Sequence, residues 1–521
     1  MNRFLRGYLW LAVFVAGMVS LALEMSAERL LGNVFGTSNL VWANIIGQTL
    51  ACLTLGYFLG GRWADRDPRP RTFYQVLAWA AFTTGLTPLA ARPVLLFAAN
   101  AVANFDAAVM GGSFLSVLIL FSVPVLLLGC VSPFAIRLAL TDSRHAGQTA
   151  GQMYAVSTLG SLVGTFTPTL WLIPTIGTMR TVLTFSGVLL LAAFVGLGAV
   201  DRRRLLWLLW MPFVLGALAV PALAGPVKPA AGLVYETESA YNYIQVVQRD
   251  DTRYLLLNEG EGIHSMYNPQ QLETFGTWDY FLAAPYFNAV PHAPDAVKSL
   301  ALVGLAAGTI ARQYTAVYGP LPVDGMEIDP AIVAAGRRYF GMTEPNLNVI
   351  VQDGRWALAH SDKRYSVIGV DAYRLPYIPW HLTTQEFFET VRAHLTDDGA
   401  LVINVGRAPN DRRLVDAMAG TLESVFPSVY VSDVPDTFNS ILYATVQPTQ
   451  AANLRANLEQ LELAGVQPLL KDALQNAVEN LQPTPRSTTV FTDDRAPVEQ
   501  LTNSIVIRFI LSGSLYELEP H

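Results

Sequence analysis

Residues 300–318 read LALVGLAAGTIARQYTAVY, and the organisation of the whole chain is clearest from this segment. An apolar run over residues 300–303 stops at Gly304, and small residues follow as far as Gly308. Residues 309–318 then have helical character, so we predict a strand, a tight turn and a helix. The small side chains leave room for a ligand against the backbone, and we expect the helix to point free N–H groups at that ligand.

Acidic residues follow the next three predicted strands. The second strand ends at Glu327, about twenty residues past the turn, where a carboxylate can accept both hydroxyls of a ribose. The third is followed by Asp353 and Gly354, a pair that suits an adenine amino group laid over bare backbone, and the fourth by Asp371. Ligands of open parallel sheets bind at the carboxyl ends of strands, so the pattern predicts a nucleoside site. A structural alternative for Asp371 is a helix cap.

The order of these motifs resembles the spermidine synthase (polyamine aminopropyltransferase) family, and most closely its membrane-fused branch. The resemblance covers roughly residues 234–446 and a tail at 492–499. It implies a Rossmann-like, methyltransferase-type parallel sheet preceded by a small β-hairpin region, which the alternation of apolar strands and helical stretches also favours. The matching segments are ESAYNYIQV (238–246), LNEGEGIHS (257–265), the glycine turn, MEID (326–329), QDG (352–354), VDAY (370–373) and FTDDRAPVE (491–499).

The resemblance implies a role for each matching residue. Glu327 would hold the ribose, Asp353 the adenine, and Asp371, the catalytic residue, the attacking amine. His264 lies near an implied binding glutamine on the substrate side, although a lone histidine is more often structural. The implied cosubstrate-binding residues are Gly304, Gly308, Glu327, Asp353, Gly354 and Asn242.

The implied reaction transfers an aminopropyl group from decarboxylated S-adenosylmethionine to a polyamine such as putrescine. A neutral amine attacks a methylene beside a sulfonium, so carboxylates that hold an amine and accept a proton suit each step. Decarboxylated or intact S-adenosylmethionine would be a cosubstrate, and no permanently bound cofactor is expected. Cys52 and Cys130 are the only cysteines and lie outside the globular half, so no thiolate metal site is expected there. No nucleic-acid partner is predicted, and the resemblance allows a homodimer.

Two positions depart from the family on the substrate side. Its glycine loop carries an acid where this chain has Ala307, and a second catalytic acid is replaced by Arg374. The guanidinium of Arg374 would repel ammonium groups and could bind a carboxylate, or it could pair with Asp371. Two alternatives therefore stay open. One is an S-adenosylmethionine-dependent, methyltransferase-like enzyme with another substrate, and the other is a transporter-like membrane protein with a nucleoside-sensing domain.

The composition divides the chain into two parts. With 52% hydrophobic and 14% charged residues, its 521 residues are too apolar for an ordinary soluble protein. Residues 1–224 carry 14 Lys and Arg against 7 Asp and Glu, a net charge of +7, whereas residues 225–521 carry 20 against 34, a net charge of −14. We predict a transmembrane domain over 1–224, a nucleoside-binding catalytic domain over 234–446, and a helical extension and tail over 447–521.

About seven apolar stretches in the first part are long enough to cross a bilayer, so we expect a multi-pass protein of the cell membrane with lipid as a partner. The stretches are 8–25, 40–60, 74–96, 114–138, 150–172, 182–200 and 205–223. Arginines at alternate loops place the N-terminus inside, and seven crossings would then place the globular domain outside. A nucleoside sulfonium donor is nevertheless expected inside.

Two local patterns complete the prediction. Small residues four apart let helix backbones approach closely in lipid, and they occur at Gly56/Gly60, Gly147/Gly151 and Gly160/Gly164. Residues 450–482 are polar and helical in pattern, with an apolar face formed by Leu454, Leu458, Leu461 and Leu463.

Overall fold

The computed structural model describes residues 3–35, 39–102, 108–140, 142–258, 262–373, 377–485 and 487–511. The chain divides into two compact units. The first comprises Met1–Ala230 and Glu236–Tyr243, and the second comprises Ala231–Tyr235 and Ile244–His521.

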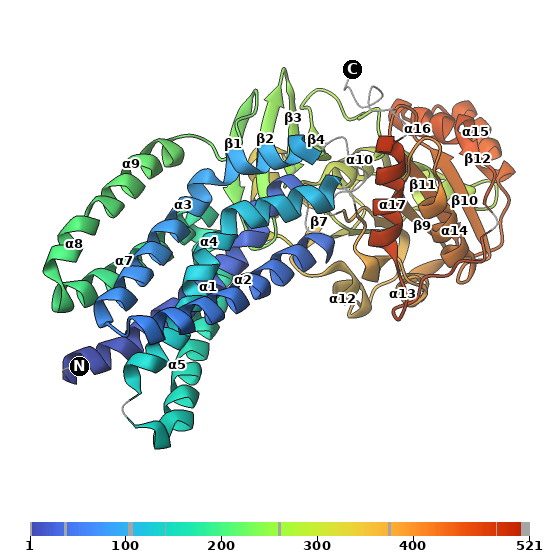
Figure 1. The fold of residues 1–521 in the computed structure, drawn as a ribbon. Helices are drawn as coiled ribbons and strands as arrows, with labels where there is room; N and C mark the ends of the chain where they lie inside the picture. Colours follow the sequence, from blue (N-terminus) through green and yellow to red (C-terminus); the bar gives the residue numbers. More distant parts are fainter. Residues whose placement is uncertain are drawn as a thin grey trace. The chain divides into compact units, whose positions relative to one another are not determined.

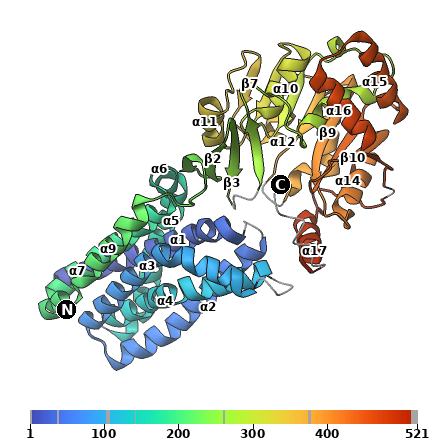
Figure 2. The same ribbon diagram turned by 90° about the horizontal axis from the view of Figure 1, so that it is seen from above.

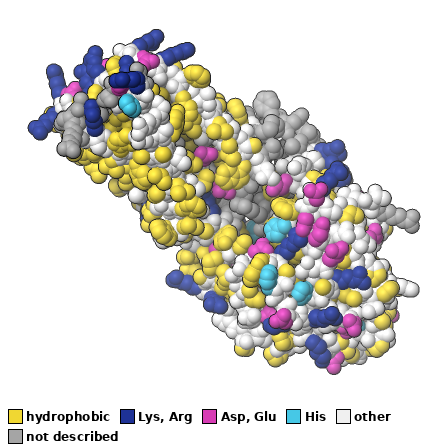
Figure 3. Space-filling model, turned by 90° about the horizontal axis from the view of Figure 1, so that it is seen from below, with side chains coloured by type: hydrophobic (Ala, Val, Ile, Leu, Met, Phe, Trp, Pro, Cys, Tyr) yellow, Lys and Arg dark blue, Asp and Glu magenta, His cyan; other side chains and the backbone are white. Residues whose placement is uncertain are grey.

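The first unit is helical (Figure 1). Its helices are α1 (Arg3–Phe35), α2 (Asn39–Arg66), α3 (Pro70–Val102), α4 (Ala108–Ala139), α5 (Ala146–Thr167), α6 (Ile173–Ile176), α7 (Thr178–Val200), α8 (Arg202–Leu208) and α9 (Trp210–Ala224), with a 3-10 turn η1 (Ser143–His145) and a π-helical turn η2 (Pro168–Leu172). Hydrophobic side chains cover much of the visible surface of this unit, whereas charges of both signs are mixed over the second unit (Figure 3). A surface this apolar is expected to face lipid.

Six helical segments among the described residues are long and apolar enough to cross a membrane. They are Phe4–Gly32, Val41–Arg66, Gly111–Ala139, Ala146–Ile176, Thr178–Val200 and Arg202–Ala224. The remaining predicted stretch, 74–96, lies within α3, which is 33 residues long and contains Pro88 and Pro93. Much of α3 is buried among the other helices, and Ser186 of α7 donates to the carbonyl of Ala81 at 2.7 Å. A helix enclosed by its neighbours meets little lipid, so its sequence can be less apolar.

Small residues allow close helix packing at four of the six predicted positions. A Cβ on Gly56 of α2 would lie 2.4 Å from the carbonyl oxygen of Leu126, and one on Gly164 of α5 would lie 1.9 Å from that of Met18. Gly60 and Gly160 are equally tight. The prediction is wrong for Gly147 and Gly151, where an added Cβ meets no atom within 4 Å.

A small antiparallel sheet opens the globular half, as the hairpin prediction requires. Its strands β1 (Leu233–Glu238), β2 (Tyr243–Arg249), β3 (Thr252–Leu257) and β4 (Ile263–Tyr267) follow one another in the order 1-2-3-4. Strands β2 and β3 pair from Ile244–Leu257 to Arg249–Thr252. Between β3 and β4 the register shifts, since Leu255 pairs with Ser265 and Leu256 with Ile263, which leaves His264 as the extra residue of a bulge.

An eight-stranded sheet forms the core of the second unit, in the order β12-β10-β11-β9-β8-β5-β6-β7. The run from β9 to β7 is parallel, and the strands on the other side of β9 are antiparallel. The strands are β5 (Leu300–Val303), β6 (Val323–Met326), β7 (Leu347–Ile350), β8 (Tyr365–Val370), β9 (Leu395–Gly406), β10 (Ser428–Asp433), β11 (Asn439–Thr445) and β12 (Leu481–Gln482).

Helices cover both faces of this sheet (Figure 2). Alternate strand residues point to opposite faces, so Leu300 and Leu302 pack in one apolar cluster and Ala301 and Val303 in another. The first face holds α10 (Thr309–Tyr318), α15 (Ala452–Ala464), α16 (Pro468–Glu479) and the 3-10 helix η3 (Asp279–Phe287). The second holds α12 (Gly354–Ala359), α13 (Gln385–Ala393), α14 (Arg413–Glu423) and α17 (Val498–Leu511), while α11 (Pro330–Tyr339) packs with the small sheet.

The predicted helical extension packs on one face of the sheet. Leu454, Leu458 and Leu461 of α15 are buried in the first cluster, as predicted. Leu463 is 86% exposed, so its assignment to the apolar face was wrong. Two residues past Leu461 is about 200° around a helix, which turns Leu463 to solvent.

Candidate functional site

The turn after β5 and the loop after β8 meet where the strand order reverses. The chain fills the sheet from β5 outward to β7 and then returns to β8 on the other side of β5. Gly304 has φ +95°, and a Cβ there would lie 2.4 Å from the carbonyl oxygen of Asp371. Only glycine allows this contact. Gly304 and Asp371 therefore lie side by side at the position where open α/β sheets bind ligands.

The N–H groups of the glycine turn are bound by protein acceptors. Ala306, at φ +47°, donates to Glu327 Oε2 at 2.9 Å, and Ala307 donates to Ser265 Oγ of β4 at 2.9 Å. Gly308 donates to the carbonyl of Leu305 at 3.0 Å. These three groups of the turn are not free for a ligand. The expectation of free N–H groups concerns the helix that begins at Thr309, and it stays a prediction.

Glu327 is buried against the glycine turn. Besides Ala306, its carboxylate accepts from the backbone N–H of Asp329 through Oε1 at 3.0 Å. Burial raises the pKa of Glu327 to about 7, although the backbone donors act in the opposite direction. Ile328, the next residue, is 41% exposed and offers an apolar surface beside the carboxylate. A ribose contact would thus be made by a carboxylate already oriented by two backbone groups.

Asp353 is held by the helix that follows it. Its Oδ1 accepts from the N–H of Trp356 at 2.9 Å and so caps α12, while its Oδ2 lies 3.1 Å from Nε2 of His381. Gly354 is close-packed, since a Cβ there would lie 2.6 Å from Val303, the last residue of β5. Asp353 therefore follows the strand next to that of Glu327, at the same edge of the sheet.

The TDDRAPVE tail is bound to the Asp353 region. Arg355 of α12 donates to both oxygens of Asp493, at 2.7 and 2.6 Å, and its Nη1 also donates to the carbonyl of His381 at 3.0 Å. Thr384 Oγ1 donates to Asp493 at 2.7 Å. A segment far along the chain thus supports the histidine that contacts Asp353.

Asp371 is held by side chains from distant elements. The indole N–H of Trp278 donates to Oδ2 at 2.9 Å, and Nδ2 of Asn404, on β9, donates to Oδ1 at 3.0 Å. Asn404 in turn accepts from Nδ2 of Asn439, on β11, at 2.8 Å. Burial raises the pKa of Asp371, and the two hydrogen bonds act against that rise. The alternative role as a helix cap is wrong, because no helix begins in the described residues directly after it.

One remaining cosubstrate-side residue and three substrate-side residues have different outcomes. Asn242 belongs to the segment that groups with the first unit, so its place in this site stays a prediction. His264 is at the bulge of β4, and burial lowers its pKa to about 4, so it is neutral at physiological pH. Ala307 is 2% exposed in an apolar cluster with Ile244 and Leu255. Arg374 lies outside the described residues.

Four contact residues were missed by sequence reasoning. Ser265, Trp278, His381 and Asn404 reach the site from separate elements, and no spacing rule connects them to it. The position of Ser265, within the quoted LNEGEGIHS segment, was the nearest available signal.

Comparison with known proteins decides the family of the second unit. A family model described as the spermine/spermidine synthase domain matches residues 293–456, which include Gly304, Glu327, Asp353 and Asp371. The second unit carries a spermine/spermidine synthase domain. The recognition made from the motifs is confirmed.

Relatives of this domain include curated polyamine aminopropyltransferases. A probable polyamine aminopropyl transferase of Bifidobacterium longum is 33% identical over 286 residues, which are 52% of this chain and 62% of that protein. The chain thus spans less than two thirds of that relative. The Vibrio vulnificus polyamine aminopropyltransferase is 27% identical over 241 residues, 44% of this chain and 77% of that protein. Among solved structures, a probable spermidine synthase from Corynebacterium glutamicum is similar, with a TM-score of 0.38 and 20% identity, and covers 50% of this chain and 98% of that chain.

Proposed function

We propose that this protein is a membrane-bound, spermidine synthase-like aminopropyltransferase. It would transfer an aminopropyl group from decarboxylated S-adenosylmethionine to an amine acceptor such as putrescine. The family of the domain supports the reaction class. The observation that carries the proposal is the pair of carboxylates beside the glycine turn, Glu327 and Asp371, to which we assign the ribose and the amine.

The proposed reaction needs no group beyond these side chains and the two substrates. The acceptor's amine nitrogen forms a bond to the propyl carbon attached to sulfur, and the carbon–sulfur bond breaks. Its electron pair stays on sulfur, so the sulfonium becomes the neutral thioether of methylthioadenosine. Asp371 takes the proton that the nitrogen loses, and its raised pKa favours that transfer near neutral pH. Glu327 fixes the nucleoside so that nitrogen, carbon and sulfur lie in line.

The test identifies products rather than binding alone. The full chain, purified in detergent, is incubated with decarboxylated S-adenosylmethionine and putrescine, and methylthioadenosine and spermidine are measured by mass spectrometry. Equal amounts of both products support the proposal. Parallel incubations contain intact S-adenosylmethionine. A methylated acceptor, formed only with the intact donor, would replace aminopropyl transfer with the methyltransferase alternative.

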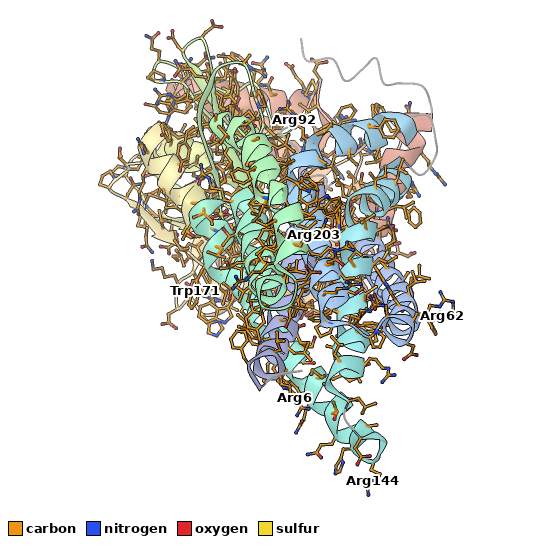
Figure 4. All side chains as sticks on the ribbon, turned by 60° about the vertical axis from the view of Figure 1, so that its left-hand side comes forward. Arg6, Arg62, Arg92, Arg144, Trp171 and Arg203 are labelled. Atoms are coloured by element: carbon orange, nitrogen blue, oxygen red, sulfur yellow. The ribbon has the colours of Figure 1, made fainter. Side chains whose placement is uncertain are left out.

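We also propose that the first unit crosses the membrane and that the domain works on the cytoplasmic side, where the donor is expected. Arg6 and Arg144 lie toward one end of the first unit and Arg92 toward the other (Figure 4). The segment Arg202–Ala224 decides the topology. Its helix α9 has 15 residues and is about 22 Å long, so the segment is long enough to cross a bilayer only if α8 is included. If Arg202–Ala224 re-enters instead of crossing, the domain returns to the side of the N-terminus.

Protease protection tests this topology. In right-side-out vesicles, the second unit is expected to resist protease until detergent opens the membrane. Cleavage from outside in sealed vesicles would mean that all seven stretches cross, and it would exclude synthesis from a cytoplasmic donor.

A further inference from the structure

We propose that Trp278 is a positioning residue for Asp371, holding the carboxylate in place without neutralising its charge. This inference rests on the proposed function, because it assigns Asp371 to the amine. Trp278 lies outside the glycine turn and the acidic strand ends, and it reaches Asp371 across 93 residues of sequence.

The chemistry of the donors distinguishes Asp371 from those carboxylates of the unit that pair with arginine. Asp433, Asp411 and Asp493 each contact an arginine at 2.6 Å or less, so a cation already balances their charge. The two side-chain donors to Asp371 are an indole and an amide, both neutral. Hydrogen bonds from neutral groups orient a carboxylate but leave its negative charge available to a cationic amine or a proton.

The position of Trp278 is itself fixed by the next residue. Asp279 is 3% exposed, and its oxygens accept from the N–H of Thr274 at 3.1 Å and from the N–H of Phe275 at 2.8 Å. Nε2 of Gln313, on α10, donates to the same carboxylate. The indole is thus anchored to the helix that follows the glycine turn, and that turn contacts the backbone of Asp371 at Gly304.

The second donor is oriented as well. Because Oδ1 of Asn404 accepts from Asn439, its Nδ2 must be the atom that faces Asp371. Asn404 and Trp278 bind different oxygens, so together they fix the plane of the carboxylate. Among the described residues, Tyr373 is a titratable neighbour of this charge, and its pKa is raised by burial first and by Asp371 second.

The first test detects the contact between Trp278 and Asp371 directly and does not depend on enzymatic turnover. The full chain is labelled with 5-fluorotryptophan in detergent, and the fluorine resonance of Trp278 is assigned by its loss in Trp278→Phe. We expect that resonance to shift as pH passes through the titration of Asp371, and to stop shifting in Asp371→Asn. Trp171→Phe, at a 70% exposed site in the first unit, is the matched control and should leave the Trp278 titration unchanged.

The second test separates positioning from a merely structural role. Loss of one hydrogen bond to the carboxylate is expected to lower kcat about tenfold in Trp278→Phe and to move the acid limb of the pH–rate profile to higher pH. Trp278→His, which keeps an N–H donor, should restore part of the rate. In the Asp371→Asn background, Trp278→Phe should have no further effect.

The two proposals fail in different ways. If the wild type forms no methylthioadenosine with any amine, the proposed function is wrong, and the fluorine titration still reports on the contact. If the Trp278 resonance does not titrate, or titrates equally in Asp371→Asn, the positioning role is wrong. An additive effect of Trp278→Phe on the residual rate of Asp371→Asn would also overturn it.

Discussion

The acidic residues at the carboxyl edge of the sheet are held in two different ways. At one end, Glu327 accepts from backbone N–H groups of the glycine turn and of Asp329, and Asp353 accepts from a backbone N–H group of α12. At the other end, Asp371 is held by the side chains of Trp278, which directly precedes η3, and of Asn404 on β9. The first arrangement is local and comes with the strand-turn-helix geometry. The second depends on long-range packing. Under the proposed function, Glu327 and Asp353 form the nucleoside end, which is generic to the fold, and Asp371 forms the amine end, which carries the specificity.

The largest effect is expected from Asp371→Asn, which changes the amine end of the proposed site and leaves the nucleoside end intact. Asp371→Asn keeps the size of the side chain but removes the proton acceptor, and loss of general base catalysis typically costs about 10²–10⁴ in rate. We expect methylthioadenosine formation to fall by that factor. The affinity for methylthioadenosine, measured by calorimetric titration, should stay within about twofold because Glu327 is untouched. A parallel loss of affinity would mean that the two ends are not separable.

The next effect concerns the cost of burying the Glu327 charge. Its pKa of about 7 exceeds the ordinary value of 4.5, so the folded state binds the proton more tightly than the unfolded state does. This contribution to stability is fully present below about pH 4.5 and is lost as pH rises through 7, in total about 3 kcal/mol. Glu327→Gln lacks this titration.

Thermal unfolding of the full chain in detergent measures that difference. Relative to the wild type, Glu327→Gln should gain stability between pH 4.5 and 8, with most of the gain near neutral pH. A constant difference between the two proteins across this range would show that the pKa of Glu327 is the same in the folded and unfolded states.

The affinity for methylthioadenosine tests whether Glu327 binds the ribose. A carboxylate that accepts two ribose hydroxyls makes charge-assisted hydrogen bonds, so Glu327→Gln should weaken methylthioadenosine binding by roughly 1.5–3 kcal/mol. In the wild type the affinity should fall as pH drops below 7, where Glu327 becomes protonated. Asn348→Ala, a change at a side chain that contacts Asp324 within the sheet, is a suitable control for nonspecific destabilisation. Unchanged affinity in Glu327→Gln would remove Glu327 from the site.

The same local and long-range division explains what the sequence predicted. The strand ends at residues 303, 326 and 370 follow from apolar runs, and Gly304 marks the turn after the first of them, so the parallel sheet was predicted from the sequence pattern. The roles of the acidic residues at these strand ends stay predictions. Trp278 and Asn404 were not, because no periodicity connects them to Asp371. Leu463 was misassigned because it follows Leu461 by two positions, about 200° around the helix, and so faces solvent.

The smallest expected effect tests whether the tail supports the nucleoside end from a distance. Asp493→Asn would keep one hydrogen bond from Arg355 but remove the negative charge of a bidentate ion pair. The pair is partly exposed, with side-chain exposures of 24% for Arg355 and 41% for Asp493. Exposed ion pairs contribute little, so we expect a loss of about 0.5–1 kcal/mol in stability. Because Arg355 also supports the carbonyl of His381, the affinity for methylthioadenosine should fall by roughly twofold to fivefold. Lys471→Gln, which removes a similarly exposed ion pair with Glu462 on α15, is the matched control and should change stability without changing affinity. If both variants bind methylthioadenosine as the wild type does, the tail stabilises α12 and α13 only, and Asp353 is positioned by the cap of α12 alone.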